Sequence, residues 1–381
     1  MTHRSLVAAI IVGTVGALTI LISPGFVGLV AAQANLSDQS AGYIAAWDIN
    51  ACAVAIGLTT FLLPRFDWRH LAFAGMVLLA AGSLATAACG SYDSLVVARV
   101  AAGIGEGLAI GVSFAALGAA SSPDKAFAWY LVAALSASAV ILFIMPSVQA
   151  AFGTRPVFEA IGVVACVSLW PAASMPSCPP GAEKPGQGQY AIQWPVALLA
   201  LAGVLLYFVA QGAVWSYFER IGHASGIAPQ TIGTTLALSS VAGIAGALLV
   251  ALLPARGGRA LPLLLGSIVS LISFLLLGGR VTATGLVVAG LAFNIAWNFC
   301  QPILSGICAS ADRGGRIVCA MGSIQTVGYG LGPAFAAALL RDGNYWPVLH
   351  MAMAFLIVSL LAVIPAARMH ARSPEILLQS K

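Results

Sequence analysis

Apolar runs of about 20 residues, each long enough to cross the ~30 Å hydrocarbon core of a bilayer as a helix, recur along the whole chain. The composition agrees, because 60% of the 381 residues are hydrophobic and only 8% are charged. A soluble domain, in which roughly a quarter of the residues are charged, could not cover its surface with so little charge. The sequence therefore predicts an all-α polytopic membrane protein.

Twelve such runs are bounded by charged residues or by Gly and Pro clusters. The first run is far longer than the ~7 to 15 residues of a signal-peptide core, so we interpret it as a membrane helix. The expected helices span residues 6–32, 41–64, 70–90, 94–119, 126–152, 155–174, 194–220, 228–253, 260–279, 283–308, 317–340 and 345–367.

The basic residues orient these helices, because Lys and Arg in short loops are retained on the cytoplasmic side during insertion. If both termini are cytoplasmic, twelve basic residues lie on that side, four lie outside and Arg99 lies within a helix, which accounts for all 17. We therefore expect cytoplasmic termini, and the short loops favour a bacterial inner membrane. The four outside are Arg155, Arg220, Arg280 and Arg341.

Residues 175–193 are rich in Pro, Gly and polar residues and cannot form a buried span. We expect a cytoplasmic linker there, between one six-helix bundle at residues 1–174 and a second at residues 194–381.

The two halves also repeat each other. LLPRFDWRHL at residues 62–71 returns as LLPARGGRAL at residues 252–261, an offset of 190. Two further echoes follow in order, Asp124 with Asp312 at an offset of 188 and Pro146 with Pro333 at an offset of 187. Three echoes at nearly one offset predict a parallel repeat, a plan known in transporters whose halves rock around a central site.

These features resemble the major facilitator superfamily along essentially the whole chain. The loop TFLLPRFDWR at residues 60–69 keeps Leu62, Arg65 and Arg69 of the family pattern G-x-L-x-D-R-x-G-R-K, with Thr and Pro in place of its Gly and Asp. ARVAAGIGEG, at residues 98–107, is similar to the family's R-x-x-x-G-x-G pattern. The resemblance implies twelve helices in two pseudo-symmetric halves, with helices two and four adjacent and helices one, four, seven and ten around a central cavity.

A further stretch, GYGLGPAFAA at residues 328–337, resembles the family's antiporter pattern G-x-x-x-G-P-x-x-G-G. In the family that pattern belongs to helix five, where this chain has FIMPSVQAA without the glycines. It therefore leaves import and export open.

Three ionisable residues fall at membrane depth, where each costs ~2.5 to 3.5 kcal/mol at a helix centre. Asp48 and Arg99 are expected to pair between helices two and four, and the alternative is that this pair only neutralises two buried charges. Arg99 and Glu106 lie seven residues apart on one helical face, roughly 10 Å from each other, so we expect no direct contact. Glu106 is the leading candidate for a proton carrier, with Asp48 and Arg99 modulating it.

The expected substrate cavity combines these charges with polar and aromatic side chains on helices seven and ten. The resemblance implies that Glu106 and Asn294 face each other across it. An alternative for the Asn-containing stripe is simple helix association through hydrogen bonds. The cavity residues are Arg99, Glu106, Gln211, Trp215, Asn294, Trp297, Asn298 and Gln301.

Other aromatic residues, Tyr217 and Phe218 at one membrane face and Trp129 and Tyr130 at the other, are expected in interfacial belts. The equivalent cytoplasmic loops are expected to make gating contacts, the alternative being that their charges only set topology. The gating candidates are Arg65, Arg69, Asp124, Arg256, Arg259, Asp312 and Arg316.

We predict a secondary active transporter that moves a small organic solute by alternating access, coupled to protons, with an organic anion or aromatic compound as substrate. The alternative is a proton-driven multidrug or sugar efflux antiporter, and an integral membrane enzyme is less favoured because no His, Cys or acidic cluster forms a catalytic or metal site. We expect no cofactor and a monomer in the bilayer. No basic patch exists for nucleic acid.

Overall fold

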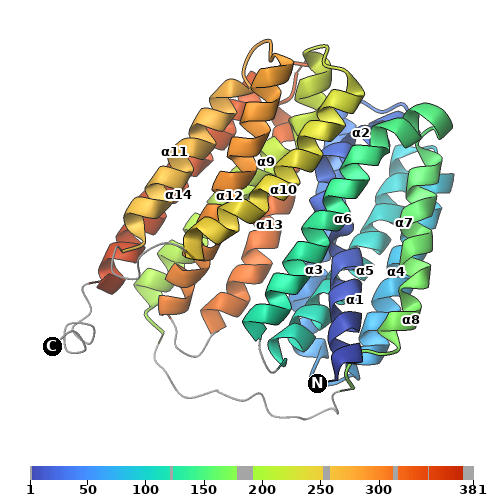
Figure 1. Cartoon of the computed structure of the whole chain (residues 1–381), viewed down its shortest axis with the longest axis horizontal. Helices are drawn as coiled ribbons and strands as arrows, with labels where there is room; N and C mark the ends of the chain where they lie inside the picture. The colour runs from blue at the N-terminus through green and yellow to red at the C-terminus, as the bar shows by residue number, and fades with distance from the viewer. Residues whose placement is uncertain are drawn as a thin grey trace.

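The computed structural model describes residues 2–120, 123–177, 192–251, 258–311, 316–341 and 343–371. Within these residues the chain forms fourteen helices, which lie in two bundles side by side (Figure 1). Ten helical stretches are long and apolar enough to cross a membrane. This confirms the prediction of an all-α polytopic membrane protein.

The helices follow the expected segments closely, with bounds that differ by a few residues. The N-terminal bundle contains α1 (His3–Leu21), α2 (Ser23–Gln33), α3 (Asp38–Leu62), α4 (Trp68–Ala88), α5 (Tyr92–Gly118), α6 (Pro123–Phe152), α7 (Arg155–Val167) and α8 (Leu169–Ala172). The C-terminal bundle contains α9 (Trp194–Ala224), α10 (Pro229–Ala251), α11 (Ala260–Leu276), α12 (Ala283–Ala311), α13 (Arg316–Leu339) and α14 (Trp346–Ala371).

Two expected segments are each broken into two helices. The segment expected at residues 6–32 is interrupted at Ile22, directly before Ser23 and Pro24. The segment expected at residues 155–174 is interrupted at Ser168, shortly before Pro171. In both places the proline has no N–H to donate to the carbonyl four residues earlier, which releases that helical bond. Apolar periodicity alone did not predict these breaks.

Small residues bring the helices of the N-terminal bundle close together. A side chain at Gly103 of α5 would collide with the backbone of Asp48 on α3, and one at Gly105 would collide with the backbone of Leu79 on α4. Close backbone approach of this kind is the usual way in which membrane helices pack. The Gly-x-Gly spacing in α5 therefore serves contact with two neighbouring helices.

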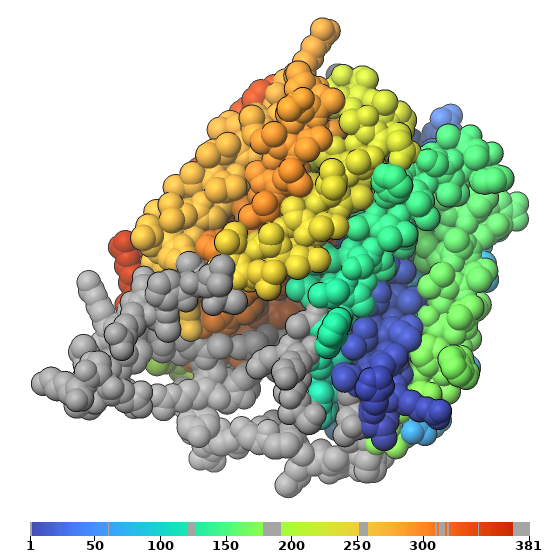
Figure 2. Space-filling model, viewed as in Figure 1, coloured from blue at the N-terminus to red at the C-terminus, as the bar shows by residue number. Residues whose placement is uncertain are grey.

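The first residues of α1 and the last residues of α14 lie at one end of the molecule (Figure 1). We call this the terminal end and the opposite one the distal end. The bundles pack on each other through α3 with α13 and through α6 with α10. Figure 2 shows α10 lying against α6 on the face in view.

Candidate functional site

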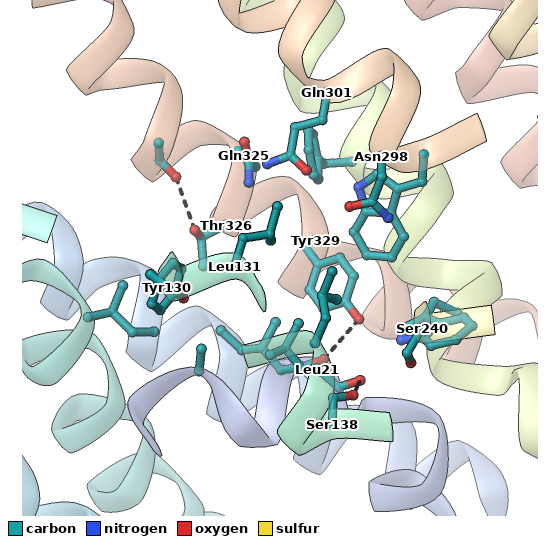
Figure 3. A pocket seen from close by; sticks show the side chains of 18 of the residues that line it. Leu21, Tyr130, Leu131, Ser138, Ser240, Asn298, Gln301, Gln325, Thr326 and Tyr329 are labelled. Carbon is teal, nitrogen blue, oxygen red and sulfur yellow. Dashed lines mark hydrogen bonds between the residues drawn. The ribbon is translucent and has the colours of Figure 1, made fainter. Parts of the chain in front are cut away.

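A cavity of about 330 Å³ lies between the two bundles. It reaches from mid-depth, at Ile20 and Leu21, towards the terminal end, where Phe114 and Tyr130 line it. Figure 3 shows Leu21, Tyr130 and Tyr329 among the lining residues. The residues that form its wall are Ala17, Ile20, Leu21, Ile56, Ile110, Phe114, Tyr130, Leu131, Leu135, Ser138, Phe208, Trp215, Ser240, Asn294, Trp297, Asn298, Gln301, Gly322, Gln325, Thr326 and Tyr329.

The two bundles contribute different chemistry to this wall. The N-terminal bundle provides mostly aliphatic side chains, with Phe114, Tyr130 and Ser138 as exceptions. The C-terminal bundle provides four amide side chains, Asn294, Asn298, Gln301 and Gln325. None of the described residues that line the cavity carries a formal charge. The wall can therefore offer many hydrogen bonds and no ion pair.

Aromatic side chains hold the C-terminal side of the cavity together. Trp297 stacks on Tyr329, with ring centroids 5.6 Å apart, and meets Trp215 edge-on at 6.4 Å. Trp215 in turn stacks on Phe293, with centroids 5.4 Å apart and an angle of 6° between the rings. Packing of this kind fixes the indole rings at the cavity wall.

Two buried donors at the wall have no partner among the described residues, the Nδ2 of Asn294 and the Nε1 of Trp297. Buried donors are normally satisfied by protein or water. Together with the stacked rings, they offer a bound molecule both a flat apolar surface and hydrogen bonds.

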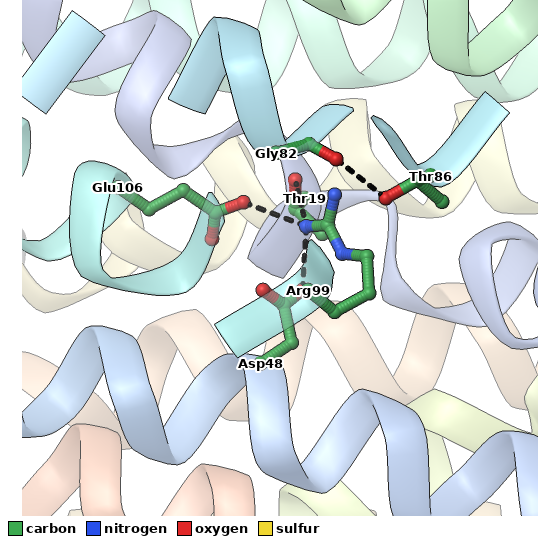
Figure 4. Close-up of polar contacts among 6 residues, drawn as sticks. All are labelled: Thr19, Asp48, Gly82, Thr86, Arg99 and Glu106. Carbon is green, nitrogen blue, oxygen red and sulfur yellow. Dashed lines mark hydrogen bonds and ion pairs between the residues drawn. The ribbon is translucent and has the colours of Figure 1, made fainter. Parts of the chain in front are cut away.

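A separate cluster of charges lies inside the N-terminal bundle, with all three side chains fully buried (Figure 4). The Nη2 of Arg99 is 2.8 Å from the Oδ2 of Asp48 and 2.9 Å from the Oε1 of Glu106. The same Nη2 lies 3.5 Å from the Oγ1 of Thr19, and the guanidinium carbon lies 4.7 Å from the ring centroid of Phe26. One cation thus faces two carboxylates in a fully buried site.

The distal end is closed by polar contacts that converge on Asp38, the first residue of α3. Its carboxylate pairs with Arg220 and accepts a hydrogen bond of 2.7 Å from the Tyr345 hydroxyl. Its backbone carbonyl accepts a bond of 3.0 Å from the Tyr217 hydroxyl. Burial, together with the Asp38 carboxylate, raises the pKa of Tyr345, so this hydroxyl keeps its proton and remains a donor.

A second polar contact joins the bundles near the same end. Gln230 of α10 accepts a hydrogen bond of 2.9 Å from the Ser147 hydroxyl of α6 and donates one of 3.3 Å to the Phe143 carbonyl. The described polar contacts between the bundles lie at the distal end and, where the Tyr329 hydroxyl meets Ile20 and Ser23, at mid-depth, while the cavity extends towards the terminal end.

Solved structures of known transporters share the fold of this chain. A crystal structure of a D-xylose-proton symporter matches with a TM-score of 0.74 at 15% identity, over 93% of this chain and 96% of that chain. The chain has the major facilitator fold.

The inward open conformation of the xylose transporter XylE from E. coli gives a TM-score of 0.70 at 17% identity, over 93% of this chain and 94% of that one. The partially occluded inward open conformation of the same transporter gives 0.69 at 13% identity, over 94% and 96% of the two chains. No protein-family model and no curated protein sequence matches this chain.

In this major facilitator fold, five of the eight expected cavity residues line the cavity: Trp215, Asn294, Trp297, Asn298 and Gln301. The other three, Arg99, Glu106 and Gln211, are fully buried away from its wall. The expectation that Glu106 faces Asn294 across the cavity is wrong, because Glu106 points at Arg99 instead.

The expectation that Arg99 and Glu106 do not touch is also wrong, since they form an ion pair. The spacing along the helix axis is correct, but two long side chains, Arg99 and Glu106, together bridge the two turns between them. The expected contact between Asp48 and Arg99 is present.

The expected aromatic belts are only partly correct. Tyr217 and Phe218 are completely buried, because Tyr217 lies against α3 and Tyr345 and Phe218 lies against Gly290 of α12. Tyr130 lines the cavity, whereas its neighbour Trp129 is 65% exposed, as a belt residue would be. Consecutive residues of a helix point in different directions, so Trp129 can face outwards while Tyr130 faces the cavity.

Of the gating candidates, Arg69 donates from its Nε to the Met175 carbonyl at 2.7 Å, which ties the start of α4 to the end of the N-terminal bundle. Arg65 is exposed. Arg259 precedes α11 and lies against Gly306 of α12. Arg256 and Asp312, and the side chains of Asp124 and Arg316, lie outside the described residues.

Sequence reasoning missed Tyr329 and Asp38. Tyr329 lies within the GYGLGP stretch, whose glycines and proline form the family-like pattern, and nothing local marks its hydroxyl as a contact to the other bundle. Asp38 directly follows Ser37, which caps α3, and so had the appearance of an ordinary helix-start acid.

Proposed function

We propose that this chain is a secondary active transporter that carries a small organic solute through the cavity between its two bundles. The observation that carries the proposal is the cavity itself, which has unpartnered buried donors at its wall and a closed distal end. Rocking of two halves about such a site is the general mechanism of repeat-built transporters. Residues 1–174 and 194–381 would be the moving halves, with residues 175–193 as their linker.

The terminal end would face the cytoplasm of a cell with the protein in its inner membrane. The excess of basic residues in the loops at that end supports this orientation. The structure would then correspond to an inward-facing state, and the matched conformations of XylE, described as inward open, agree with this interpretation.

Proton coupling would reside in the cluster of Asp48, Arg99 and Glu106. One guanidinium balances one carboxylate, so two ionised carboxylates leave one negative charge uncompensated in a fully buried site. Uptake of one proton would cancel that charge, and its release would restore it. A matched solved structure is that of a proton symporter, which supports this assignment.

The solute would be uncharged. The described cavity wall contains amides, hydroxyls and aromatic rings. The prediction of an organic-anion substrate required Arg99 at this wall, but Arg99 is buried inside the N-terminal bundle. An ion placed in this cavity would lose its hydration without gaining a counter-charge. A hydroxylated or aromatic neutral compound fits the wall best.

The test is transport by the purified protein in liposomes with an imposed pH gradient. The probes are D-xylose, an uncharged phenyl glycoside, benzoate and tetraphenylphosphonium. Accumulation or extrusion of a neutral probe that collapses with the gradient would support the proposal. Transport of only the charged probes would reject the uncharged solute, and no pH-driven movement of any probe would contradict a proton-coupled transporter for these compound classes.

Glu106→Gln tests the proton site, with Glu159→Gln as the matched control, because Glu159 is a half-exposed carboxylate paired with Arg155. Glu106→Gln should abolish gradient-driven accumulation while leaving exchange of solute across the membrane. Glu159→Gln should behave like the parent protein. Unchanged accumulation in Glu106→Gln would exclude Glu106 as the proton carrier.

A further inference from the structure

The break in the first membrane segment is the place where the charge cluster, the cavity and the contact between the bundles meet. The break lies at Ile22, between α1 and α2, next to Leu21 of the cavity wall (Figure 3). Pro24 cannot donate to the Ile20 carbonyl, which is the helical partner four residues earlier. A carbonyl released in this way at membrane depth needs another donor.

The donor comes from the opposite bundle. The Tyr329 hydroxyl of α13 donates to the Ile20 carbonyl at 3.2 Å and lies 2.7 Å from the Ser23 Oγ. One hydroxyl from the C-terminal bundle thus contacts residues on both sides of the break. These bonds join the bundles at mid-depth. When the bundles move relative to each other, the bonds must either break or act as the pivot of the motion.

The same tyrosine is part of the cavity wall. Its ring stacks on Trp297, and both rings line the cavity. A solute held against Trp297 would therefore also contact the ring whose hydroxyl holds the break. The position of Tyr329 depends on both the cavity contents and the break.

The charge cluster contacts the break from the other side. Arg99 lies against Thr19, the residue just before Ile20, and against the ring of Phe26, one turn after the break. The guanidinium thus lies against α1 at Thr19 (Figure 4) and against α2 at Phe26, on either side of the interruption. A change in the charge balance of Asp48, Arg99 and Glu106 would alter how Arg99 holds these two helices.

We propose that the broken segment Ile20–Pro24 transmits the charge state of the Asp48–Arg99–Glu106 cluster to Tyr329, and through it to the cavity and to the contact between the bundles. Tyr329 acts as a positioning residue in this scheme. The inference rests on the proposed function, because it assumes that the cluster gains and loses a proton during transport.

Other ionisable groups lie near the break, and no test substitution should replace them. Glu219 of α9 lies against Gly28 of α2, and pairs with His223 at 3.2 Å. Among the described residues, two further ionisable groups near the break are the Cys52 thiol of α3, close to Asp48 and Glu106, and the Tyr130 hydroxyl of α6.

The experiment is a double-mutant cycle that requires no known substrate. Hydrogen–deuterium exchange of the full-length protein in detergent is measured at several pH values for the parent, Glu106→Gln, Tyr329→Phe and the double variant. The readout is exchange in peptides at the distal end, covering residues 34–41 and 341–346, which report its closure. Tyr207→Phe, which removes another buried tyrosine hydroxyl of the C-terminal bundle, is the matched control.

We expect Glu106→Gln to change distal-end exchange by about 5-fold or more, the lower end of usual coupling between sites, and to remove its pH dependence. In the Tyr329→Phe background, the same substitution should produce no further change, whereas in the Tyr207→Phe background it should act in full. Ser23→Ala should weaken the response partially, because Tyr329 keeps the Ile20 carbonyl as acceptor.

The failures are distinguishable. If Glu106→Gln acts equally in the parent and in Tyr329→Phe, the coupling route through the break is overturned while the cluster remains a proton site. If Glu106→Gln has no effect on the pH dependence in the parent, the proton site of the proposed function fails, and the inference fails with it. A thermal melting temperature equal to that of the parent establishes that Tyr329→Phe is folded. If Tyr329→Phe does not fold, Ser23→Ala takes its place in the cycle, with the same check of its melting temperature.

Discussion

Replacing Asp38 with alanine should weaken the closure of the distal end. The Asp38 carboxylate accepts a hydrogen bond from Tyr345 and pairs with Arg220, and both partners belong to the other bundle. A hydrogen bond to a charged acceptor contributes ~1.5 kcal/mol, and an ion pair that is partly exposed contributes ~1 kcal/mol. The sum, about 2.5 kcal/mol, corresponds to a factor of about 60 in a two-state equilibrium.

The expected consequence is a change in population, because these contacts exist only while the distal ends of the bundles are together. A protein that is about 99% closed at this end would become about 60% closed in Asp38→Ala. The assay is a distance measurement between spin labels at positions 90 and 284, exposed positions at the distal ends of the two bundles. A side chain at Gly90 would meet no atom within 4 Å, so a label fits there.

Arg155→Ala is the control, since it removes an exposed ion pair at the distal end within one bundle. It should leave the distance distribution unchanged. Reactive native cysteines such as the exposed Cys166 are replaced first in all variants. A folded Asp38→Ala protein with the parent's distance distribution would refute the assignment of these contacts to closure.

Three further outcomes follow from the geometry. Tyr345→Phe should raise the ratio of open to closed distal ends by about 10-fold, because it removes a hydrogen bond that contributes ~1.5 kcal/mol. The effect should be the same at all pH values up to about 9, since the raised pKa of Tyr345 keeps its hydroxyl protonated. The same pair of spin labels measures this ratio. Trp297→Ala should weaken binding of a transported neutral solute by about 10-fold or more, as measured by calorimetry, since it removes a stacked ring of the cavity wall. Gly103→Ala should destabilise the protein by ~1 to 3 kcal/mol in denaturant unfolding, because the added carbon meets the Asp48 backbone, whereas Gly118→Ala, with open space around it, should not.

Much of the fold follows from local patterns in the sequence. Hydropathy located the membrane segments, and the echoes between residues 62–71 and 252–261 indicated two related halves, because both signals depend on residues close together in the chain or on simple repetition. The break at Pro24 was missed even though proline is the usual cause, since an apolar run remains apolar across an interruption.

Some features of the candidate site could likewise be predicted from the sequence, and others could not. The cost of burying charge was enough to single out Asp48, Arg99 and Glu106, and helical spacing was enough to predict the polar stripe at Asn294 and Trp297. Spacing could not predict that Arg99 reaches Glu106, because that depends on the conformation of a long side chain and on the space left by neighbouring helices.

The contacts between the bundles were decided by tertiary structure alone. Tyr329 meets Ile20 across 309 positions of sequence, and Tyr345 meets Asp38 across 307. Neither residue differs in kind from others nearby, and no local pattern distinguishes a tyrosine that faces the opposite bundle from one that faces lipid. The sequence by itself determined which segments enter the membrane, because that depends on transfer free energies of individual residues. Which side chains line the cavity and close its distal end depended on how two bundles, distant in sequence, pack face to face.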